Sequence, residues 1–384
     1  MTQNLRIPGP TPLPDDVLEA QSTPMIDHRG TEFAEMLHEI TASIGTLIGT
    51  SNDVLLLTGS GSGAMEAAIV NTLSPGDRVL AVSIGGFGDR FAAITEAFGA
   101  IVERFDVEWG EAADPDALAA HLAANPPYRA VLVTLNETST GVVNPMAKLA
   151  AAVRHAPGAP LLVVDGISGL GAMPFDMDAW GVDLVLSASQ KAWMAAPGIS
   201  FAVVGPRAWE ARERARMPRS YWDFAEARAW AAKGQTPWTP AVSVLFGLRV
   251  GLRRLLAEGP SRTWARHEAV ARGAQAGLEA AGLRLVAPPG HRSPTVTAAW
   301  LPDGLDWSPF NASMRAKGLV VAGGQGKWVG KILRFGHMGD VDWPDIGAAV
   351  TVLAETLGEY GHPSDAHAAA AAGRAAFESA LVAR

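Results

Sequence analysis

Hydrophobic and polar residues alternate along the first two thirds of the chain in the pattern of strands followed by helices. Short apolar runs such as 130–136 and 160–166 have the length of buried strands, and segments such as 115–124 carry apolar residues at helical spacing. Strands that alternate with helices form mostly parallel sheets covered on both faces. The pattern predicts an α/β domain on a mostly parallel sheet of seven strands, at 54–58, 78–84, 101–107, 130–136, 160–166, 183–189 and 199–205.

The alternation stops near residue 260, and the rest of the chain mixes helices with short strands. A long helical stretch covers 261–282, and a last helix is predicted after Pro363. Between them the pattern predicts four strands and two helices, near 284–287, 294–301, 308–317, 319–322, 331–335 and 343–358. This mixture is typical of a smaller α+β domain. We therefore divide the chain into a large domain at 15–255 and a small domain at 1–14 together with 256–384.

Composition narrows the range of functions. The 384 residues carry a net charge of −8, and an acidic chain without a basic cluster is a poor binder of nucleic acid. The absence of cysteine excludes disulfides, thiolate metal sites and cysteine nucleophiles, and the nine histidines lack metal-binding spacing. Residues 1–24 are rich in proline, are predicted to be extended and carry no targeting signal, and no apolar run is long enough to cross a membrane. We expect a cytoplasmic protein without a metal site.

A turn rich in glycine and serine, at 58–63, joins the first predicted strand to a helix. Glycines let the backbone approach a ligand, and a helix N-terminus offers free N–H groups to an anion. Ser60 and Ser62 add hydroxyl groups, so the turn is a candidate phosphate cradle. The alternatives are a structural turn and a loose dinucleotide-binding fingerprint. The fingerprint needs an acid at the end of the next strand, and the strand at 78–84 ends without one.

Three further polar residues stand where predicted strands end. Asp165 ends one strand and Lys191 follows the next, which places both at the edge of a parallel sheet where ligands bind. Arg334 lies near the end of a strand in the second domain, and a guanidinium can bind a carboxylate with two hydrogen bonds. Taken singly, each could be an ordinary capping, surface or ion-paired residue. In this order, with the cradle, they form the pattern of a pyridoxal 5'-phosphate (PLP) enzyme, which needs a phosphate site, an anion at the ring nitrogen and an amine for the aldehyde.

Ten short motifs carry a resemblance that runs in order along almost the whole chain. The sequence resembles class V aminotransferases of the alanine/serine–glyoxylate group, which have PLP-dependent fold type I. The resemblance implies a homodimer with a shared active site, bound PLP, and small amino acids and 2-oxo acids as substrates. The matching segments are PGPTPLP at 8–14, HRGTEF at 28–33, TGSGSGAMEAA at 58–68, GGFGDR at 85–90, ETSTG at 137–141, VDGISGLG at 164–171, SQKAW at 189–193, TPWTPAV at 236–242, RSPTVTA at 292–298 and RFGHMG at 334–339.

The resemblance implies roles for individual residues. Lys191 would attach the cofactor aldehyde and move the proton between the substrate Cα and the cofactor, and Asp165 would pair with the pyridine nitrogen. Phe87 stands where family members place an aromatic ring, frequently Trp, against the pyridine. Thr138 would lie near the cofactor's ring hydroxyl, and Arg334 would bind the α-carboxylate of the substrate.

The implied phosphate contacts come from both subunits of the dimer. Thr239, and less directly Thr236, would reach the phosphate from the partner subunit, although family members often have Tyr near position 236. Four residues of the first subunit would hold the phosphate: Ser60, Gly61, Ser62 and Gln190. Three residues of matching segments remain without an assigned role: His28, Arg29 and Arg292.

A single carboxylate-binding arginine favours substrates with one carboxylate, because an unpaired buried charge is costly. We expect alanine or serine as the amino donor and glyoxylate or pyruvate as the acceptor. Alternatives in the family are pyridoxamine–pyruvate, ureidoglycine–glyoxylate and aspartate–glyoxylate transamination; the phosphate cradle disfavours the first, and His28 disfavours the second, where an amide is expected. Cysteine desulfuration is excluded because it needs a cysteine.

Two alternatives lie outside transamination. A nicotinamide-dependent dehydrogenase would use the glycine-rich turn, but it lacks the acid that holds the ribose. A non-catalytic scaffold protein of the same fold is disfavoured by the intact set of Lys191, Asp165 and Arg334.

Overall fold

Two β-sheets form the framework of the computed structural model, which describes residues 3–382. The larger sheet consists of β2 (Asp53–Thr58), β3 (Arg78–Ser83), β4 (Ile101–Asp106), β5 (Ala130–Thr134), β8 (Leu161–Asp165), β9 (Leu184–Ala188) and β10 (Ile199–Val204). Its order is β2-β10-β9-β8-β5-β3-β4, and only β10 runs antiparallel to its neighbours. The predicted seven-stranded, mostly parallel sheet is confirmed.

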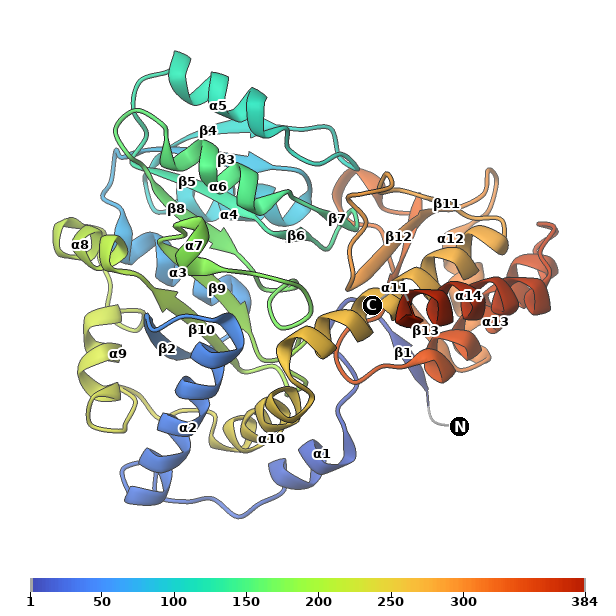
Figure 1. Cartoon of the computed structure of the whole chain (residues 1–384), viewed down its shortest axis with the longest axis horizontal. Helices are drawn as coiled ribbons and strands as arrows, with labels where there is room; N and C mark the ends of the chain where they lie inside the picture. The colour runs from blue at the N-terminus through green and yellow to red at the C-terminus, as the bar shows by residue number, and fades with distance from the viewer. Residues whose placement is uncertain (1–2, 383–384) are drawn as a thin grey trace.

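Helices cover both faces of this sheet, as Figure 1 shows. They are α2 (Thr31–Ile48), α3 (Gly61–Thr72), α4 (Gly86–Ala97), α5 (Pro115–Ala124), α6 (Met146–Arg154), α7 (Met177–Trp180), α8 (Pro206–Arg214), α9 (Phe224–Ala231) and α10 (Val242–Glu258). Alternate residues of each central strand enter two separate hydrophobic cores. Along β5, Val131 and Val133 face the core that includes α2 and α10, and Ala130 and Leu132 face the core that includes α3 and α8. Burial on both faces explains why these strands are continuous apolar runs.

The smaller sheet is mixed and lies on the right of Figure 1. Its strands are β1 (Asn4–Arg6), β11 (Arg284–Leu285), β12 (Val296–Trp300), β13 (Leu319–Gly323) and β14 (Ile332–Gly336), in the order β1-β13-β14-β12-β11. It packs with α11 (Pro260–Ala280), α12 (Trp307–Ala316), α13 (Trp343–Glu359) and α14 (Ala366–Val382) around a third core. The first strand of the chain pairs in parallel with β13, so that Leu5 lies opposite Val320. The start of the chain therefore belongs to the C-terminal sheet.

Extended structure throughout 1–24 is a wrong prediction, because this segment contains α1 (Asp15–Gln21). Asp15 and Asp16 lie in the first turn of this helix, directly after Pro14, and acidic side chains stabilise a helix N-terminus. Pattern reading also missed the small hairpin of β6 (Asn136–Glu137) and β7 (Val142–Val143), whose strands are too short to show a period. Within residues 3–382, no helix is long and apolar enough to span a membrane.

Candidate active site

Asp165 and Lys191 lie at the same edge of the larger sheet. Asp165 is the last residue of β8, paired with Thr134 of β5 on one side and Leu186 of β9 on the other. Its side chain is buried, and its Oδ1 accepts the backbone N–H of Ile167 at 2.9 Å. Burial raises the pKa of Asp165 to about 7, although the positive charge of Lys191 acts in the opposite direction. The carboxyl group is thus held at the edge of the sheet without an ion pair that would fix its charge.

The Lys191 amine is buried three residues beyond the end of β9. Its Nζ donates a hydrogen bond to the backbone carbonyl of Pro8, which belongs to the N-terminal segment. Burial lowers the pKa of Lys191 to about 8, the charges of Arg334 and Arg90 lower it further, and Asp165 opposes them. A lysine in such surroundings has a substantial neutral fraction near physiological pH, and a neutral amine is a nucleophile.

The glycine-rich turn forms the N-terminus of α3, as predicted. Ser60 is exposed and precedes the helix, whose first N–H groups have no intrahelical acceptors. A Cβ atom at Gly61 would lie 2.5 Å from Cδ1 of Ile167, the residue whose N–H binds Asp165. Glycine at this position therefore brings the helix N-terminus against the loop that carries Asp165. On the other side, Cβ atoms at Gly59 and Gly63 would overlap the Trp222 ring.

Phe87 lies in the first turn of α4, where Glu137 fixes the backbone. The Glu137 carboxylate is completely buried and accepts the N–H groups of Phe87 and Gly88, at 3.0 and 3.1 Å. Burial raises the pKa of Glu137, and these hydrogen bonds oppose the rise. The Phe87 ring is half-buried, and the guanidinium carbon of Arg90 lies 4.8 Å from its centre. The Glu137 carboxyl group at the N-terminus of α4 thus holds the aromatic residue in place through these hydrogen bonds.

Thr138 and Arg334 connect the two sheets at the site. The Thr138 hydroxyl donates to Ser168 Oγ at 2.8 Å, and its carbonyl accepts Nη1 of Arg334 at 3.4 Å. Arg334 lies on β14, and its Nε donates to the carbonyl of Gly323 at 2.8 Å. Burial lowers the pKa of Arg334 to about 10, which still leaves it positively charged at neutral pH. Within the described residues Nη2 has no hydrogen-bond partner, so this end of the guanidinium is available to an anion.

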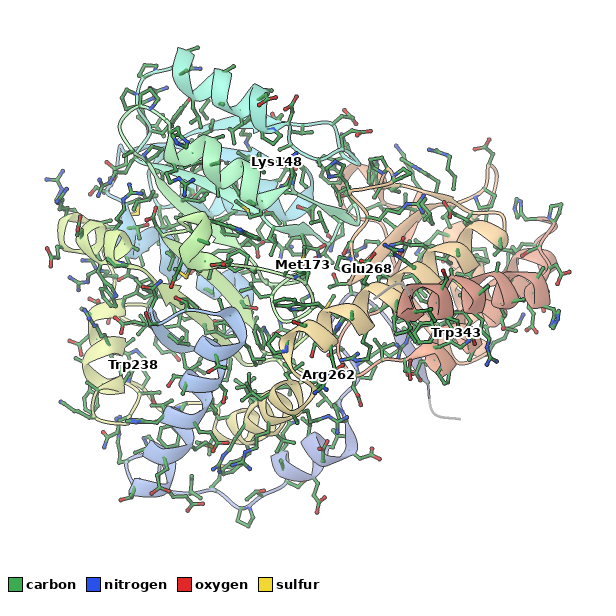
Figure 2. The ribbon with its side chains drawn as sticks, in the orientation of Figure 1. Lys148, Met173, Trp238, Arg262, Glu268 and Trp343 are labelled. Atoms are coloured by element: carbon green, nitrogen blue, oxygen red, sulfur yellow. The ribbon has the colours of Figure 1, made fainter. Side chains whose placement is uncertain are left out.

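Neither Thr236 nor Thr239 forms a hydrogen bond with the Lys191 amine of the same chain. The hydroxyl of Thr236 donates to the carbonyl of Trp238 at 2.8 Å, and Thr239 is exposed. The Trp238 ring is 43% exposed and stacks on Tyr221, and Figure 2 shows Trp238 at the surface of the large domain.

The three residues to which the resemblance assigned no role each contact other residues of the same chain. Arg29 donates to the carbonyls of Thr236 and Pro237 and stacks on Trp230, so it supports the 236–237 segment. Arg292 forms a 2.7 Å ion pair with Glu279. His28 contacts the edge of Phe33.

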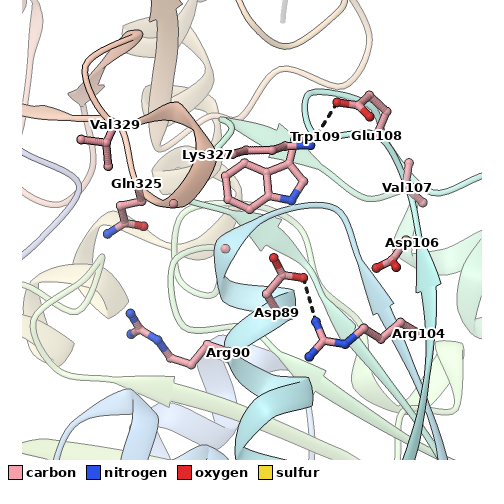
Figure 3. Close-up of a pocket in the computed structure, with 13 residues that line it drawn as sticks. Asp89, Arg90, Arg104, Asp106, Val107, Glu108, Trp109, Gln325, Lys327 and Val329 are labelled. Atoms are coloured by element: carbon pink, nitrogen blue, oxygen red, sulfur yellow. Dashed lines mark hydrogen bonds and ion pairs between the residues drawn. The ribbon is translucent and has the colours of Figure 1, made fainter.

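A cleft of about 960 Å³ lies between the small-domain loop at 324–329 and a wall formed by the start of α4 and the segment at 104–109. Figure 3 shows Arg90 entering it from α4 and Gln325 from the opposite side. An ion pair of 3.1 Å between Lys327 and Glu108 joins the two walls. The cleft is wide enough for an amino acid. Arg90 lines it, whereas Lys191, Asp165 and Arg334 do not.

Sequence reasoning did not assign roles to Glu137, Arg90 or Pro8. All three stand in the matching segments, at 137–141, 85–90 and 8–14. Arg90 has no carboxylate within ion-pair distance among the described residues, and its charge influences both Asp165 and Lys191. A signal was present for Arg90, because it stands one helical turn after Phe87 and therefore on the same face. The role of the Pro8 carbonyl has no signal in sequence, since any residue has a carbonyl.

Comparisons with known proteins identify the family. The family model described as "Aminotransferase class-V" matches residues 8–333. The chain is 41% identical to the small subunit of soluble hydrogenase from Synechococcus sp., over 93% of this chain and 94% of that protein. It is 37% identical to L-aspartate–glyoxylate aminotransferase of Paracoccus denitrificans, over 87% and 86%, and 35% identical to serine–glyoxylate aminotransferase of Hyphomicrobium methylovorum, over 94% and 91%.

The fold leads to the same family. The crystal structure of ureidoglycine–glyoxylate aminotransferase from Bacillus subtilis matches with a TM-score of 0.92 at 26% identity, over 98% of both chains. The match includes both sheets, because it covers nearly the whole chain. The chain belongs to the class V aminotransferases, in their glyoxylate-type group, and has fold type I.

Proposed function

We propose that this enzyme is a PLP-dependent aminotransferase that moves the amino group of alanine or serine to glyoxylate or pyruvate. One observation carries the proposal: a buried amine and a buried carboxyl group share one sheet edge, and a cation from the second sheet lies beside them. These are Lys191, Asp165 and Arg334. The arrangement supplies the nucleophile, the partner of a ring nitrogen and the carboxylate-binding group that transamination requires.

The residues at this edge fit PLP. Oε1 of the Gln190 side-chain amide is buried without a hydrogen-bond partner among the described residues. An amide oxygen only accepts hydrogen bonds, so the NH₂ group of this side chain would have to face a phosphate. The N–H groups at the start of α3 are suited to a phosphate, and Ser60 adds an exposed hydroxyl there. Among the described residues only Oδ1 of Asp165 accepts a hydrogen bond, so Oδ2 is available to a protonated ring nitrogen. Phe87 offers a half-buried aromatic face.

Each residue then has a defined task. When bound, PLP supplies an aldehyde that condenses with amino groups and a ring that accepts the electrons released at the substrate Cα. Lys191 would move the proton from the substrate Cα to the aldehyde carbon of the cofactor in the first half-reaction and in the reverse direction in the second. Arg334 binds the α-carboxylate and thereby turns the Cα–H bond towards Lys191. Asp165 holds the proton on the ring nitrogen.

The choice of substrates follows from the arginines of the matching segments. Arg334 binds one carboxylate, and Arg292 is paired with Glu279, so a neutral side chain needs no further partner. A relative of 35% identity is named serine–glyoxylate aminotransferase, which supports serine as donor and glyoxylate as acceptor. The hydrogenase name of another relative does not suit this chain, because iron–sulfur clusters are held by cysteines and the chain has none.

A second candidate is aspartate as the amino donor. Arg90 favours it, because this arginine enters the cleft from α4 and has no carboxylate partner within the described residues. A relative of 37% identity is named L-aspartate–glyoxylate aminotransferase. In this case Arg90, rather than Arg29 or Arg292, would bind the second carboxylate.

The experiment is a matrix of donors and acceptors on the purified enzyme. Alanine, serine, aspartate, glutamate, pyridoxamine and ureidoglycine are each tested with glyoxylate and with pyruvate. We expect the highest kcat/KM for alanine or serine with glyoxylate. An advantage of aspartate that disappears in Arg90→Gln would establish the second candidate. A protein that shows no coloured cofactor band and no transfer with any pair would refute the proposed function.

We further propose that the enzyme is a homodimer with a shared active site. Thr239 and Trp238 are exposed in the single chain, and Trp238 forms an exposed aromatic pair with Tyr221. Trp222, next to this pair, packs against the glycines of the phosphate cradle. A second subunit that covers Trp238 would therefore also influence how Trp222 packs against the phosphate cradle.

A further inference from the structure

The N-terminal segment at 7–11 forms a strap that runs from the smaller sheet to Lys191. The strap begins directly after β1, which pairs with β13. It then passes the end of β14, where a Cβ atom at Gly336 would overlap the carbonyl of Ile7. The path has no spare room, so the position of the strap is set by the smaller sheet.

Three hydrogen bonds and one close approach fix the strap to Lys191 and its neighbour Gln190. The Pro8 carbonyl accepts a hydrogen bond from Nζ of Lys191. The N–H of Thr11 donates to the carbonyl of Gln190 at 3.2 Å, and its hydroxyl donates to the carbonyl of Lys191 at 3.3 Å. Gly9 has φ +111°, and a Cβ atom there would lie 2.7 Å from Nζ and 2.9 Å from Cδ of the lysine. The Lys191 side chain thus occupies the space that a side chain at position 9 would need.

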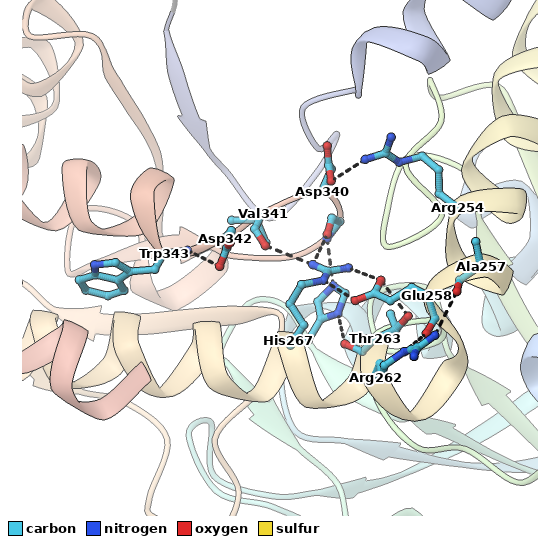
Figure 4. Close-up of polar contacts among 12 residues, drawn as sticks. Arg254, Ala257, Glu258, Arg262, Thr263, His267, Asp340, Val341, Asp342 and Trp343 are labelled. Carbon is cyan, nitrogen blue, oxygen red and sulfur yellow. Dashed lines mark hydrogen bonds and ion pairs between the residues drawn. The ribbon is translucent and has the colours of Figure 1, made fainter. Parts of the chain in front are cut away.

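The opposite side of the strap is held by the loop after β14. A Cβ atom at Gly339 would lie 3.4 Å from Thr11 and 3.5 Å from Cγ of Met194. Gly339 donates its N–H to Nε2 of His267 at 3.1 Å, and its carbonyl accepts Nη1 of Arg266 at 2.9 Å. Figure 4 shows this loop held to α11 through these contacts. The strap therefore lies between the lysine and a firmly bonded loop.

We propose that the strap is a positioning element for Lys191: it holds the amine at the Pro8 carbonyl, keeps water from it, and transmits the position of the smaller sheet to the lysine. Gly9 is the residue on which this depends, because only a residue without a side chain leaves room for the amine. The effect of the strap on catalysis rests on the proposed function. The contact between the strap and Lys191 can be tested without it, through the reactivity of the Lys191 amine.

The test measures the reactivity of the Lys191 amine in the cofactor-free protein. Acetic anhydride labels lysines in competition across a pH series, and mass spectrometry reads Lys191 relative to exposed Lys148, which Figure 2 shows on α6. Unmodified protein should give a labelling midpoint near pH 8 for Lys191. Gly9→Ala should raise the midpoint by about one unit or more, because water that reaches the amine favours its charged form.

Two controls separate this effect from general loosening. Gly304→Ala places the same residue at a similar φ of +79°, with open space around it, and should leave the midpoint unchanged. Half-buried Lys317, bound to Glu359, reports loosening elsewhere and should label as before. A Lys191 midpoint in Gly9→Ala that equals or falls below the Gly304→Ala value overturns the proposal.

A milder pair of variants decides the matter if Gly9→Ala does not fold. Thr11→Val keeps the volume but removes the hydroxyl that binds the Lys191 carbonyl, and Thr11→Ser restores it. The midpoint should rise in Thr11→Val and return in Thr11→Ser, and the absence of any difference between the two overturns the proposal. A protein inactive towards every donor would still give these midpoints, so the proposed function and the strap fail separately.

Discussion

The Glu137 carboxylate accepts the backbone N–H of Phe87 through both of its oxygens, at 3.0 and 3.2 Å. Because Phe87 lies in the first turn of α4, this contact sets the place at which the aromatic ring enters the site. The two residues stand 50 positions apart. A completely buried carboxylate thus acts on the cofactor site through a backbone rather than through direct contact.

Glu137→Gln should weaken both the fold and cofactor binding. The new amide NH₂ faces the N–H groups of Phe87 and Gly88, and a buried N–H without an acceptor costs about 1–3 kcal/mol. Thermal unfolding and PLP titration measure the two effects, with Glu111→Gln at an exposed position as the control. Unchanged stability and affinity in Glu137→Gln would contradict the positioning role.

Asp165→Asn should stabilise the cofactor-free protein at alkaline pH. Burial raises the pKa of Asp165 from 3.8 to about 7, so between these values the folded state binds a proton that the unfolded state has released. The contribution of Asp165 to stability is therefore full at acidic pH and is lost as the pH rises through 7. Asn carries no charge, so the variant gains up to about 4 kcal/mol above pH 7.

Calorimetry of the cofactor-free protein at about pH 5 and about pH 8 checks this sign. The stability difference between Asp165→Asn and the unmodified protein should be larger at the higher pH. Asp303→Asn, at an exposed loop position, should show the same small difference at both. An equal stability difference at the two pH values would show that Asp165 is already ionised in the folded protein at the lower pH.

Lys191→Ala should abolish transamination and leave no cofactor bond that borohydride can fix. The Lys191 amine is the buried lysine at the sheet edge, and its lowered pKa makes it available as a nucleophile. Mass spectrometry after borohydride treatment measures the covalent link, with Lys148→Ala as an exposed control that should retain it. If cofactor is still fixed to Lys191→Ala, another lysine carries the link.

Arg334→Lys should raise KM for amino acids and 2-oxo acids together. Lysine keeps the charge but loses the planar fork, of which Nε and Nη1 already bind Gly323 and Thr138. We expect an increase on the order of tenfold or more, which corresponds to about 1.4 kcal/mol of lost binding. Amines without a carboxylate should be little affected, and an equal loss for both kinds of substrate would refute carboxylate recognition.

Thr239→Val should weaken PLP binding if the partner subunit supplies this hydroxyl. A lost hydrogen bond to a charged phosphate is expected to cost about 1.5–3 kcal/mol. Titration at decreasing protein concentration tests the shared site, because cofactor affinity should fall as dimers dissociate. Thr23→Val, also exposed, is the matched control. A fully active monomer in sedimentation experiments would rule out the shared site.

The larger sheet and two residues at its edge could be predicted from the amino-acid sequence alone. Continuous apolar runs are recognisable as strands because burial on both faces leaves no polar positions, and all seven appear where they were predicted. Asp165 and Lys191 could be placed at one edge because the carboxyl ends of parallel strands meet there. The glycine-rich turn was also recognisable from local sequence, because it lies between a strand pattern and a helix pattern.

Only the tertiary structure decided how distant segments complete the site. Arg334 meets Thr138 across 196 positions, and the Pro8 carbonyl meets Lys191 across 183. These contacts depend on how the smaller sheet packs against the larger one, and no local period or propensity encodes that packing. The Pro8 contact uses a backbone carbonyl, which every residue possesses, so the contact cannot be predicted from the residue type. The physical reason is that strand and helix patterns report burial along the chain, whereas the site is formed where the two sheets come together.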